Sequence, residues 1–232
     1  MRAKDIKVIC IAALVPLLFI AVPGLMDGFK AATAKFPYIM SFIKFAVLST
    51  FGECIGLRLL TGDYNRPGFG IVPKALVWGV LGIGIKAAFT IFGAGAPTML
   101  AEIGLPVSAS TLANGSFGLR LLTAFTISAS LNCIFAPVFM TLHKATDMHI
   151  AATGGSLGAF FSKPAMGDLL QNIDWRRMWG FVFRLTIPLF WIPMHTVTFL
   201  LPSQFQVLFA ALLGVALGVI LALASVKKTP AA

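Results

Sequence analysis

The chain has 232 residues, of which 58% are hydrophobic and only 11% are charged. An ordinary globular domain carries roughly 25% charged residues, so this composition excludes a soluble enzyme with a conventional polar surface. The formal net charge of +10 does not indicate nucleic-acid binding, because the basic residues stand singly or in pairs at the ends of apolar runs and form no stripe. The charge instead indicates how the chain is oriented in a membrane.

Six apolar stretches follow one another, and each is long enough for the about 20 residues that a membrane-spanning helix needs. They lack the alternation of membrane β-barrel strands, and unpaired backbone groups are costly in lipid, so each stretch must be helical. The sequence therefore predicts an all-α, polytopic integral membrane helical bundle. Its expected spans are residues 6–26, 37–60, 71–94, 117–142, 176–200 and 205–225.

The distribution of Lys and Arg among the connections predicts the orientation. Twelve lie at the amino terminus, in the second and fourth connections and in the tail, and only Lys30 and Lys35 lie on the opposite side. Because cytoplasmic connections carry the excess of positive charge, both termini are expected in the cytoplasm. We expect a single membrane domain over residues 1–232, with an additional amino-terminal span and connection, a helical core and a cytoplasmic tail at residues 1–35, 36–225 and 226–232.

Two connections are longer than turns. The third, residues 95–116, contains Pro97 and Pro106 and is expected to be re-entrant or to lie on the surface. In the fourth, apolar residues recur at helical spacing after Pro164, which predicts a short amphipathic helix that either lies in the membrane interface or caps the bundle.

Ionisable side chains inside spans are the most informative residues, since each costs about 2.5 to 3.5 kcal/mol to insert at a helix centre. Lys86 shares a helix face with Gly79 and Gly82, which predicts that it points into the bundle. The alternative is a lysine that snorkels to the headgroups. Lys44, half a turn out of phase with Glu53, is expected to snorkel.

The fourth span carries a stripe of small and polar residues at i+4 spacing. Such a stripe lines a water-filled path or forms hydrogen bonds between helices, and the sequence does not separate the two. Its members are Arg120, Ala124, Ser128, Asn132 and Ala136.

On the fifth span, Arg184, Trp191 and His195 fall on one face of a regular α-helix. Arg184 and Glu53 occupy the same half of the membrane, which predicts an ion pair that is either structural or part of a gate. His195 is interpreted as a hydrogen-bonded interfacial residue or as a proton relay.

Catalytic motifs are absent from the sequence, which contains no HExxH, GxSxG or Walker loop. No in-span carboxylates or histidines stand at metal-ligand spacing. We therefore expect no enzyme activity, no catalytic or metal site and no cofactor.

Several short motifs resemble those of the twenty-two-kilodalton peroxisomal membrane protein family, which includes the Mpv-seventeen mitochondrial inner-membrane protein. Gly52-Glu53 stands where the family has Gly-Asp, and Asn132-Cys133-Ile134-Phe135-Ala136-Pro137 resembles its Asp-Gln-x-x-Phe-Ala-Pro. The remaining motifs are Phe36-Pro37, Asp174-Trp175, Trp191-Ile192-Pro193 and Phe199-Leu200-Leu201-Pro202 with Phe205. The resemblance implies a divergent bacterial member and a pore for small solutes in an inner or organelle membrane.

Together these observations predict a small channel or transporter for anionic or neutral solutes in a bacterial inner membrane, with a mitochondrial or peroxisomal membrane as the alternative. The expected path or gate residues are Glu53, Lys86, Arg120, Asn132, Arg184, Trp191 and His195. The alternative function is a structural or lipid-binding protein that transports nothing. Expected partners are membrane lipids, including anionic phospholipid, an unidentified small solute and a second copy of the chain, but not nucleic acid.

Overall fold

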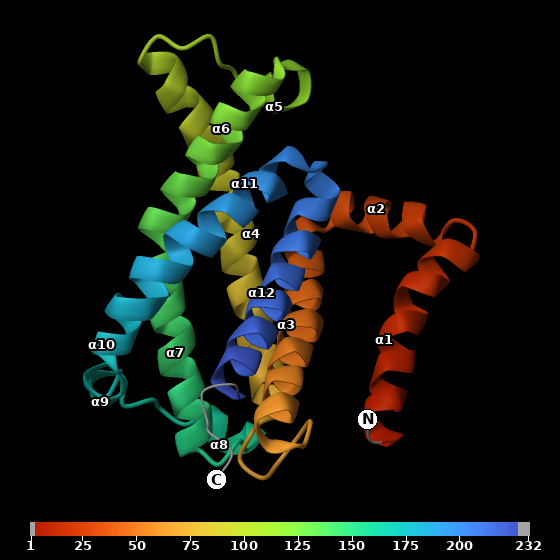
Figure 1. The fold of residues 1–232 in the computed structure, drawn as a ribbon, viewed down its shortest axis with the longest axis vertical. Helices are drawn as coiled ribbons and strands as arrows, with labels where there is room; N and C mark the ends of the chain where they lie inside the picture. The colour runs from red at the N-terminus through yellow and green to blue at the C-terminus, as the bar shows by residue number, and fades with distance from the viewer. Residues whose placement is uncertain (1–2, 227–232) are drawn as a thin grey trace.

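The computed structural model describes residues 3–226, so the predictions for Arg2, Lys227 and Lys228 lie outside the described residues. Every regular element in this part of the chain is a helix (Figure 1), which confirms the all-α prediction. The elements are α1 (Ala3–Ala21), α2 (Leu25–Lys35), α3 (Pro37–Thr61), α4 (Ile71–Glu102), α5 (Thr111–Asn114), α6 (Phe117–Ser130), η1 (Leu131–Phe135), α7 (Ala136–Ala152), α8 (Leu157–Phe160), α9 (Met166–Gln171), α10 (Trp175–Arg177), η2 (Met178–Trp191), α11 (Ile192–Leu200) and α12 (Ser203–Val226).

Five helical segments are long and apolar enough to cross a membrane, and a sixth is obtained if the bent pair α1 and α2 is one span. Three of the five are the single helices α3, α4 and α12, whereas α6 to α7 and α10 to α11 run on as continuous segments of 36 and 26 residues. The protein therefore has the architecture of a polytopic helical membrane protein.

The first predicted span, residues 6–26, is not one straight helix. α1 ends at Ala21, and α2 leaves it at an angle of 96°. Pro23 cannot continue the helical hydrogen bonding, and Gly24 adopts a left-handed conformation with φ of 79°, which glycine reaches without the steric cost that other residues meet. α2 consequently projects sideways from the start of α3, and α1 stands apart from the other helices (Figure 1).

The helix of the third span is longer than predicted. α4 continues through Pro97 to Glu102, so only residues 103–116 form the connection, and they include the short α5. Ala96, Pro97 and Leu100 are buried. The glycines before Pro97 and Pro97 itself favour a loop, but packing against the neighbouring α6 keeps this segment helical.

α3 packs against α4 along one of its sides and against α12 along another. Glycines allow these close approaches. A Cβ on Gly82 would lie 2.7 Å from the backbone oxygen of Ser41, and one on Gly52 would lie 3.0 Å from the Cα of Val215. These contacts hold α3, α4 and α12 in one block.

Two segments widen into π-helical hydrogen bonding, η1 before Pro137 and η2 around Pro188. A proline removes an amide donor and crowds the preceding turn, and a π-helical turn accommodates both effects inside a continuous helix. In η2 the widening spans 14 residues, so side chains there do not follow the α-helical period.

The described ends of the chain, Ala3 and Val226, lie at the same end of the bundle (Figure 1). We call this the basic end, because Arg58, Arg66 and Arg177 lie there, and we call the opposite one the far end. The described residues thus agree with an architecture that places both termini on one side.

The amphipathic helix predicted in the fourth connection is present as α9, which begins two residues after Pro164. It packs against α7, and Ile173 just beyond it is buried in the cluster that also contains Ala136 and Met178. The connection therefore packs against α7 and joins it to the start of η2.

Candidate functional site

A cavity of about 1090 Å³ lies inside the bundle. Its walls come from α3, α4, η1, α7, α10, η2, α11 and α12, with contributions from the connection between α3 and α4. On η1 and α7 the lining residues run from Leu131 to Ala151, a helical length of about 30 Å at about 1.5 Å per residue. That length is comparable to the hydrocarbon thickness of a bilayer, about 30 Å.

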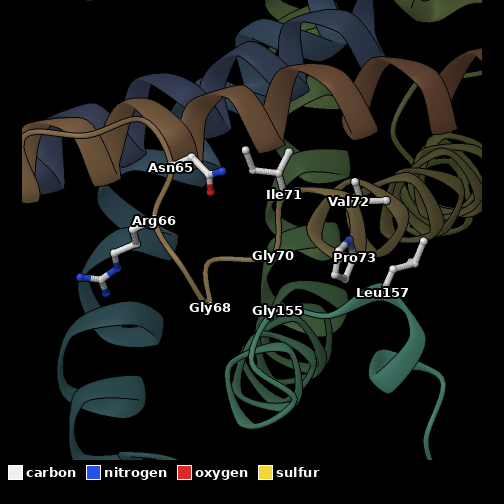
Figure 2. Close-up of a pocket in the computed structure, with 9 residues that line it drawn as sticks. All are labelled: Asn65, Arg66, Gly68, Gly70, Ile71, Val72, Pro73, Gly155 and Leu157. Atoms are coloured by element: carbon white, nitrogen blue, oxygen red, sulfur yellow. The ribbon is translucent and has the colours of Figure 1, made fainter.

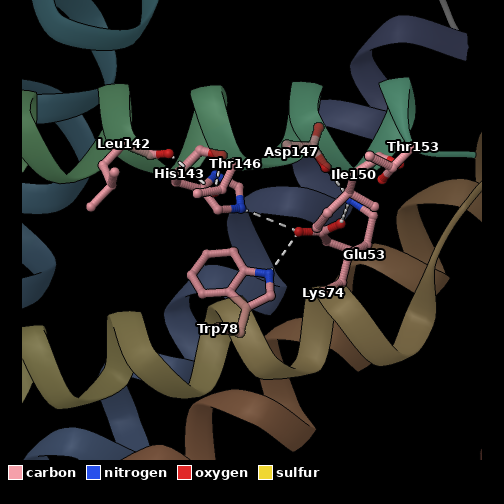
Figure 3. Close-up of polar contacts among 9 residues, drawn as sticks. All are labelled: Glu53, Lys74, Trp78, Leu142, His143, Thr146, Asp147, Ile150 and Thr153. Carbon is pink, nitrogen blue, oxygen red and sulfur yellow. Dashed lines mark hydrogen bonds and ion pairs between the residues drawn. The ribbon is translucent and has the colours of Figure 1, made fainter. Parts of the chain in front are cut away.

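An ionic cluster occupies the half of the cavity nearer the basic end (Figure 3). Glu53 Oε2 lies 2.6 Å from the Lys74 Nζ, and its Oε1 accepts a hydrogen bond of 2.6 Å from Trp78 Nε1. His143 Nε2 lies 3.4 Å from the same Oε1. Lys74 also pairs with Asp147 across the cavity wall, from α4 to α7.

The two carboxylates of the cluster share one ammonium. Lys74 is 8% exposed and lies between the two carboxylates of Glu53 and Asp147, while Glu53 accepts from an ammonium and an indole N–H. Buried charges persist only when they are paired and hydrogen-bonded in this way. The cluster joins α3, α4 and α7 and fixes the polar side chains that face the cavity at this depth.

A second polar group lies deeper, at the inner end of the cavity. Asn132 Nδ2 donates to the Ser128 backbone oxygen at 2.8 Å and contacts His195 Nδ1 at 3.1 Å. The rings of Trp191 and His195 lie 5.2 Å apart, and the ring of Phe89 meets His195 edge-on at 5.7 Å. Asn132, Trp191 and His195 all line the cavity, so three predicted site residues form one group.

Small residues leave the cavity open along α3 and α12. A Cβ added to Gly56, Gly214 or Gly218 would meet nothing within 4 Å, and all three glycines line the cavity. The small-residue pair on α12 therefore provides space for a ligand and no helix contact. Gly52, one turn before Gly56, does pack against α12.

The entrance at the basic end carries cationic side chains. Arg66, Lys144 and Arg177 line the cavity there, are exposed, and have no carboxylate partner among residues 3–226. Asp174 also lines this end, and it accepts a hydrogen bond from the Arg177 backbone amide. The excess of unpaired cations gives the entrance a positive potential.

A smaller pocket of about 330 Å³ lies where the connection between α3 and α4 meets the turn after α7 (Figure 2). Gly70 and Gly155 touch so closely that a Cβ on Gly155 would lie 2.7 Å from the Gly70 nitrogen. The exposed Arg66 points away from the other labelled residues. This pocket reflects the packing of two turns, and Arg66 is the charged residue among those that line it.

Three predicted site residues lie outside the cavity. Lys86 does not point into the bundle: it is partly exposed, and its Nζ donates to Thr90 Oγ1 on its own helix at 3.0 Å. Gly82 does pack against α3, so sharing a helix face with this glycine did not place Lys86 in the cavity.

The predicted ion pair between Glu53 and Arg184 is wrong. Glu53 pairs with Lys74, and Arg184 is exposed on η2 away from the cavity. The prediction assumed an α-helical period, whereas η2 is π-helical over Met178–Trp191, which turns Arg184 away from the face of Trp191. Lys44 does not snorkel either, since its Nζ donates to Thr33 Oγ1 at 3.0 Å beneath α2.

The stripe on the fourth span divides between its two alternative roles. Ser128 is fully buried and donates to the Ile192 backbone oxygen at 2.7 Å, so it joins α6 to α11. Asn132 and Ala136 line the cavity. Arg120 lies near the start of α6, outside the cavity, and its buried Nε has no partner among the described residues.

Sequence reasoning missed Lys74, Trp78, His143 and Asp147 as cavity residues. Lys74 was counted with the charges of the second connection, although it lies inside the apolar stretch that begins at Ile71. Glu53 is the single carboxylate in a predicted span, and it requires a nearby cation. The need for a cation near Glu53 could have pointed to Lys74. Nothing in the sequence linked Glu53 to His143, 90 positions away.

Comparisons with known proteins identify no relative: no known protein family, no curated protein and no solved structure matches the chain. Within residues 3–226, no group of three or more His, Cys, Asp and Glu side chains is placed to hold a metal ion. The function must therefore be argued from the cavity itself.

Proposed function

We propose that the protein passes small anionic or neutral solutes across a membrane through the cavity, as a carrier or a gated channel. The observation that carries this proposal is the length of the cavity, whose walls extend over about 30 Å of helix from the basic end to Asn132 and His195. A structural helical bundle needs no such space, because protein interiors are normally close-packed. The family resemblance and a bacterial inner membrane belong to the same proposal.

The far end of the cavity is closed by packed side chains, which favours a gated path over a permanently open pore. Phe45 and Phe89 form the inner limit of the lining and belong to a buried cluster with Phe199 and Ile127. A solute bound near His195 would have to wait for these aromatic side chains to separate. The closed end thus represents one state of an alternating or gated cycle.

The charges of the entrance determine the proposed selectivity. Arg66, Lys144 and Arg177 are unpaired, whereas Glu53 and Asp147 are each paired with the ammonium of Lys74. An anion entering from the basic end therefore meets attraction first and no free carboxylate in the ionic cluster. With the basic end proposed to face the cytoplasm, solutes enter from that side.

A liposome-swelling assay tests the proposal. Vesicles containing the purified chain are transferred to isosmotic potassium lactate with valinomycin, to glycerol or to choline chloride, and swelling reports entry of each solute. We expect lactate and glycerol to enter faster than in protein-free vesicles, and choline to be excluded. Equal entry of choline would contradict the selectivity, and the absence of any flux would contradict transport.

Matched variants connect the flux with the cavity. Gly218→Leu fills open space in the cavity and is expected to reduce lactate entry at least fivefold, whereas Lys86→Met lies outside the cavity and is expected to leave it unchanged. Thermal unfolding of both variants verifies that they fold. Equal effects of the two substitutions on flux would show that the solute takes another route.

Lipid binding without transport is the second candidate function, and the arrangement of two helices favours it. α12 and η2 both line the cavity and each contacts α11, and the two helices diverge toward the basic end (Figure 1). An anionic phospholipid could enter between them from the bilayer. Native mass spectrometry distinguishes the functions: a retained anionic lipid together with absent flux would support lipid binding, whereas flux without retained lipid supports transport.

A further inference from the structure

We propose that the inner end of the cavity binds the carboxylate of a small monocarboxylic acid with a flat apolar body, of which benzoate is the simplest probe. This inference rests on the proposed function, because it names the class of solute that the path accepts. Three independent features carry it: hydrogen-bond donors at the inner end, an aromatic wall, and open space opposite that wall.

One donor at the inner end, His195 Nε2, has no protein acceptor among the described residues. Asn132 Nδ2 donates to the Ser128 oxygen, which fixes the amide orientation, so the contact with His195 Nδ1 makes that nitrogen the acceptor. A neutral imidazole whose Nδ1 accepts carries its proton on Nε2. Nε2 has no partner among the described residues, and His195 lines the cavity. Asn132 is thus a positioning residue, because it holds His195 in the tautomer whose Nε2–H donor faces the cavity.

Two further donors reinforce this chemistry. Trp191 Nε1, which can only donate, is buried and has no hydrogen-bond partner in the described part of the chain. The hydroxyl of Ser49, a cavity-lining residue only 5% exposed, is also unpartnered. Buried polar atoms in proteins are nearly always satisfied, so unsatisfied donors around one cavity indicate a missing acceptor. A carboxylate offers acceptor sites and no donor.

Aromatic side chains of α4, η1 and α7 form one wall of the cavity, and they determine which kind of ligand fits beside them. Trp78 and Phe139 have ring centroids 6.4 Å apart, and Phe135 lies 5.5 Å from Phe139. Such a row of rings favours a flat apolar group. α12 presents Gly214 and Gly218 to the cavity, where an added Cβ meets nothing within 4 Å. The cavity therefore has room for a ring beside its aromatic wall.

Equilibrium binding of radiolabelled benzoate to the full chain in lipid nanodiscs tests the proposal. We expect saturable binding that excess unlabelled benzoate displaces and that benzylamine, which has the same ring and a positive charge, does not. Displacement by benzylamine at similar concentrations would overturn the carboxylate assignment, as would the absence of saturable benzoate binding.

Two pairs of variants locate the site. Trp191→Phe keeps a ring but removes the donor, and we expect about a tenfold loss of benzoate affinity. Trp179→Phe, the same change at an exposed position on the same helix, is expected to leave affinity unchanged. Gly218→Leu should abolish binding while thermal unfolding stays cooperative. Equal affinities of the Trp191→Phe and Trp179→Phe chains would overturn the assignment of the donor.

The role of Asn132 has its own readout. Nitrogen-15 NMR of the imidazole groups should show the His195 proton on Nε2 in the native chain, and Asn132→Leu should remove this single-tautomer signature while lowering benzoate affinity. A His195 proton on Nδ1 in the native chain would contradict the positioning role.

The binding and flux measurements separate this inference from the proposed function. Lactate flux that depends on the cavity, together with no benzoate binding, would overturn the solute class and leave transport standing. Saturable benzoate binding sensitive to Trp191→Phe, with no flux of any solute, would support the site and contradict transport.

Discussion

The buried ammonium of Lys74 is the residue on which the polar half of the cavity depends. It lies between Glu53 and Asp147, and Glu53 in turn orients Trp78 and His143. Removing a partner from a buried charge network leaves the other charges unpaired in a region of low dielectric constant, which typically costs about 3 to 5 kcal/mol. The cluster is therefore a condition for the fold of the cavity as well as part of its lining.

We expect Lys74→Met to lower the thermal unfolding temperature strongly, because it leaves two carboxylates without their shared cation. Lys144→Met is the matched control, since Lys144 is an exposed, unpaired lysine of the same cavity. Differential scanning fluorimetry of the two variants in one detergent provides the comparison. A Lys74→Met chain as stable as the Lys144→Met chain would show that the ion pairs contribute little.

At the scale of single residues, the sequence pattern identified four polar or amphipathic residues of the cavity, but the predicted ion-pair partner of Glu53 was wrong. Glu53, Asn132, Trp191 and His195 stand out as polar or amphipathic groups within apolar runs, and all four line the cavity. Arg184 stands out equally, and it lies outside because the π-helical turns of η2 change the side-chain period. A one-dimensional pattern read at 3.6 residues per turn cannot anticipate that change.

Among the elements, the contact between α3 and α12 shows how glycine position determines packing. Gly52 touches the Cα of Val215, whereas Gly56, one turn further along α3, faces the open cavity. Both belong to the same sequence pattern of small residues. Their different surroundings make them a direct test of the arrangement of these helices.

We expect Gly52→Val to push α12 away from α3 and to destabilise the chain by about 1 to 3 kcal/mol, the usual cost of overpacking. The same substitution at Gly56 should be tolerated, because a Cβ there meets nothing within 4 Å. Chemical unfolding followed by circular dichroism measures both variants. If Gly56→Val were the more damaging change, the packing of α12 described above would be incorrect.

α1 is attached to the bundle near its two ends and has no buried residue along its length. At the basic end, Arg58 makes two hydrogen bonds of 2.8 Å to Asp5, and Tyr64 donates to Asp5 at 3.2 Å. Desolvation and this hydrogen bond raise the pKa of Tyr64 above its ordinary value.

We expect Asp5→Ala to increase hydrogen exchange in residues 3–21 several-fold and to leave exchange in α3 and α4 unchanged, because α1 contributes nothing to the buried core. Mass spectrometry of peptides from the exchanged chain provides the measurement, with Asp27→Ala in the exposed Lys30 pair as the control. An equal rise in α3 would show that α1 supports the bundle.

Element boundaries were predictable where hydropathy and packing agree, as in α3 and α12, whose spans match the apolar stretches closely. They were not predictable where tertiary contacts decide. α4 continues through Pro97 because that segment is buried, and the first apolar stretch breaks at Pro23 and Gly24 although its hydropathy is uninterrupted. Hydropathy reports the environment of a segment and not its direction.

The whole molecule combines a closed far end with a cavity that opens toward the basic end, and this asymmetry was not visible in the sequence. Composition and charge predicted a helical membrane bundle with both termini on one side. The cavity arises from the placement of Gly56, Gly214 and Gly218 opposite the aromatic side chains of α4 and α7, a relation between distant segments that no local pattern records.

The most direct test of the central claim, that the cavity is the solute path, is thiol modification within it. In a chain whose Cys10, Cys54 and Cys133 are replaced by Ala, Gly218→Cys places a thiol in the cavity, and Ile220→Cys places one on the exposed outer face of the same helix. A membrane-impermeant methanethiosulfonate reagent applied at the basic end should modify Gly218→Cys and block lactate flux, and should leave Ile220→Cys unmodified and active. Full lactate flux through a Gly218→Cys chain that is completely modified would contradict the claim.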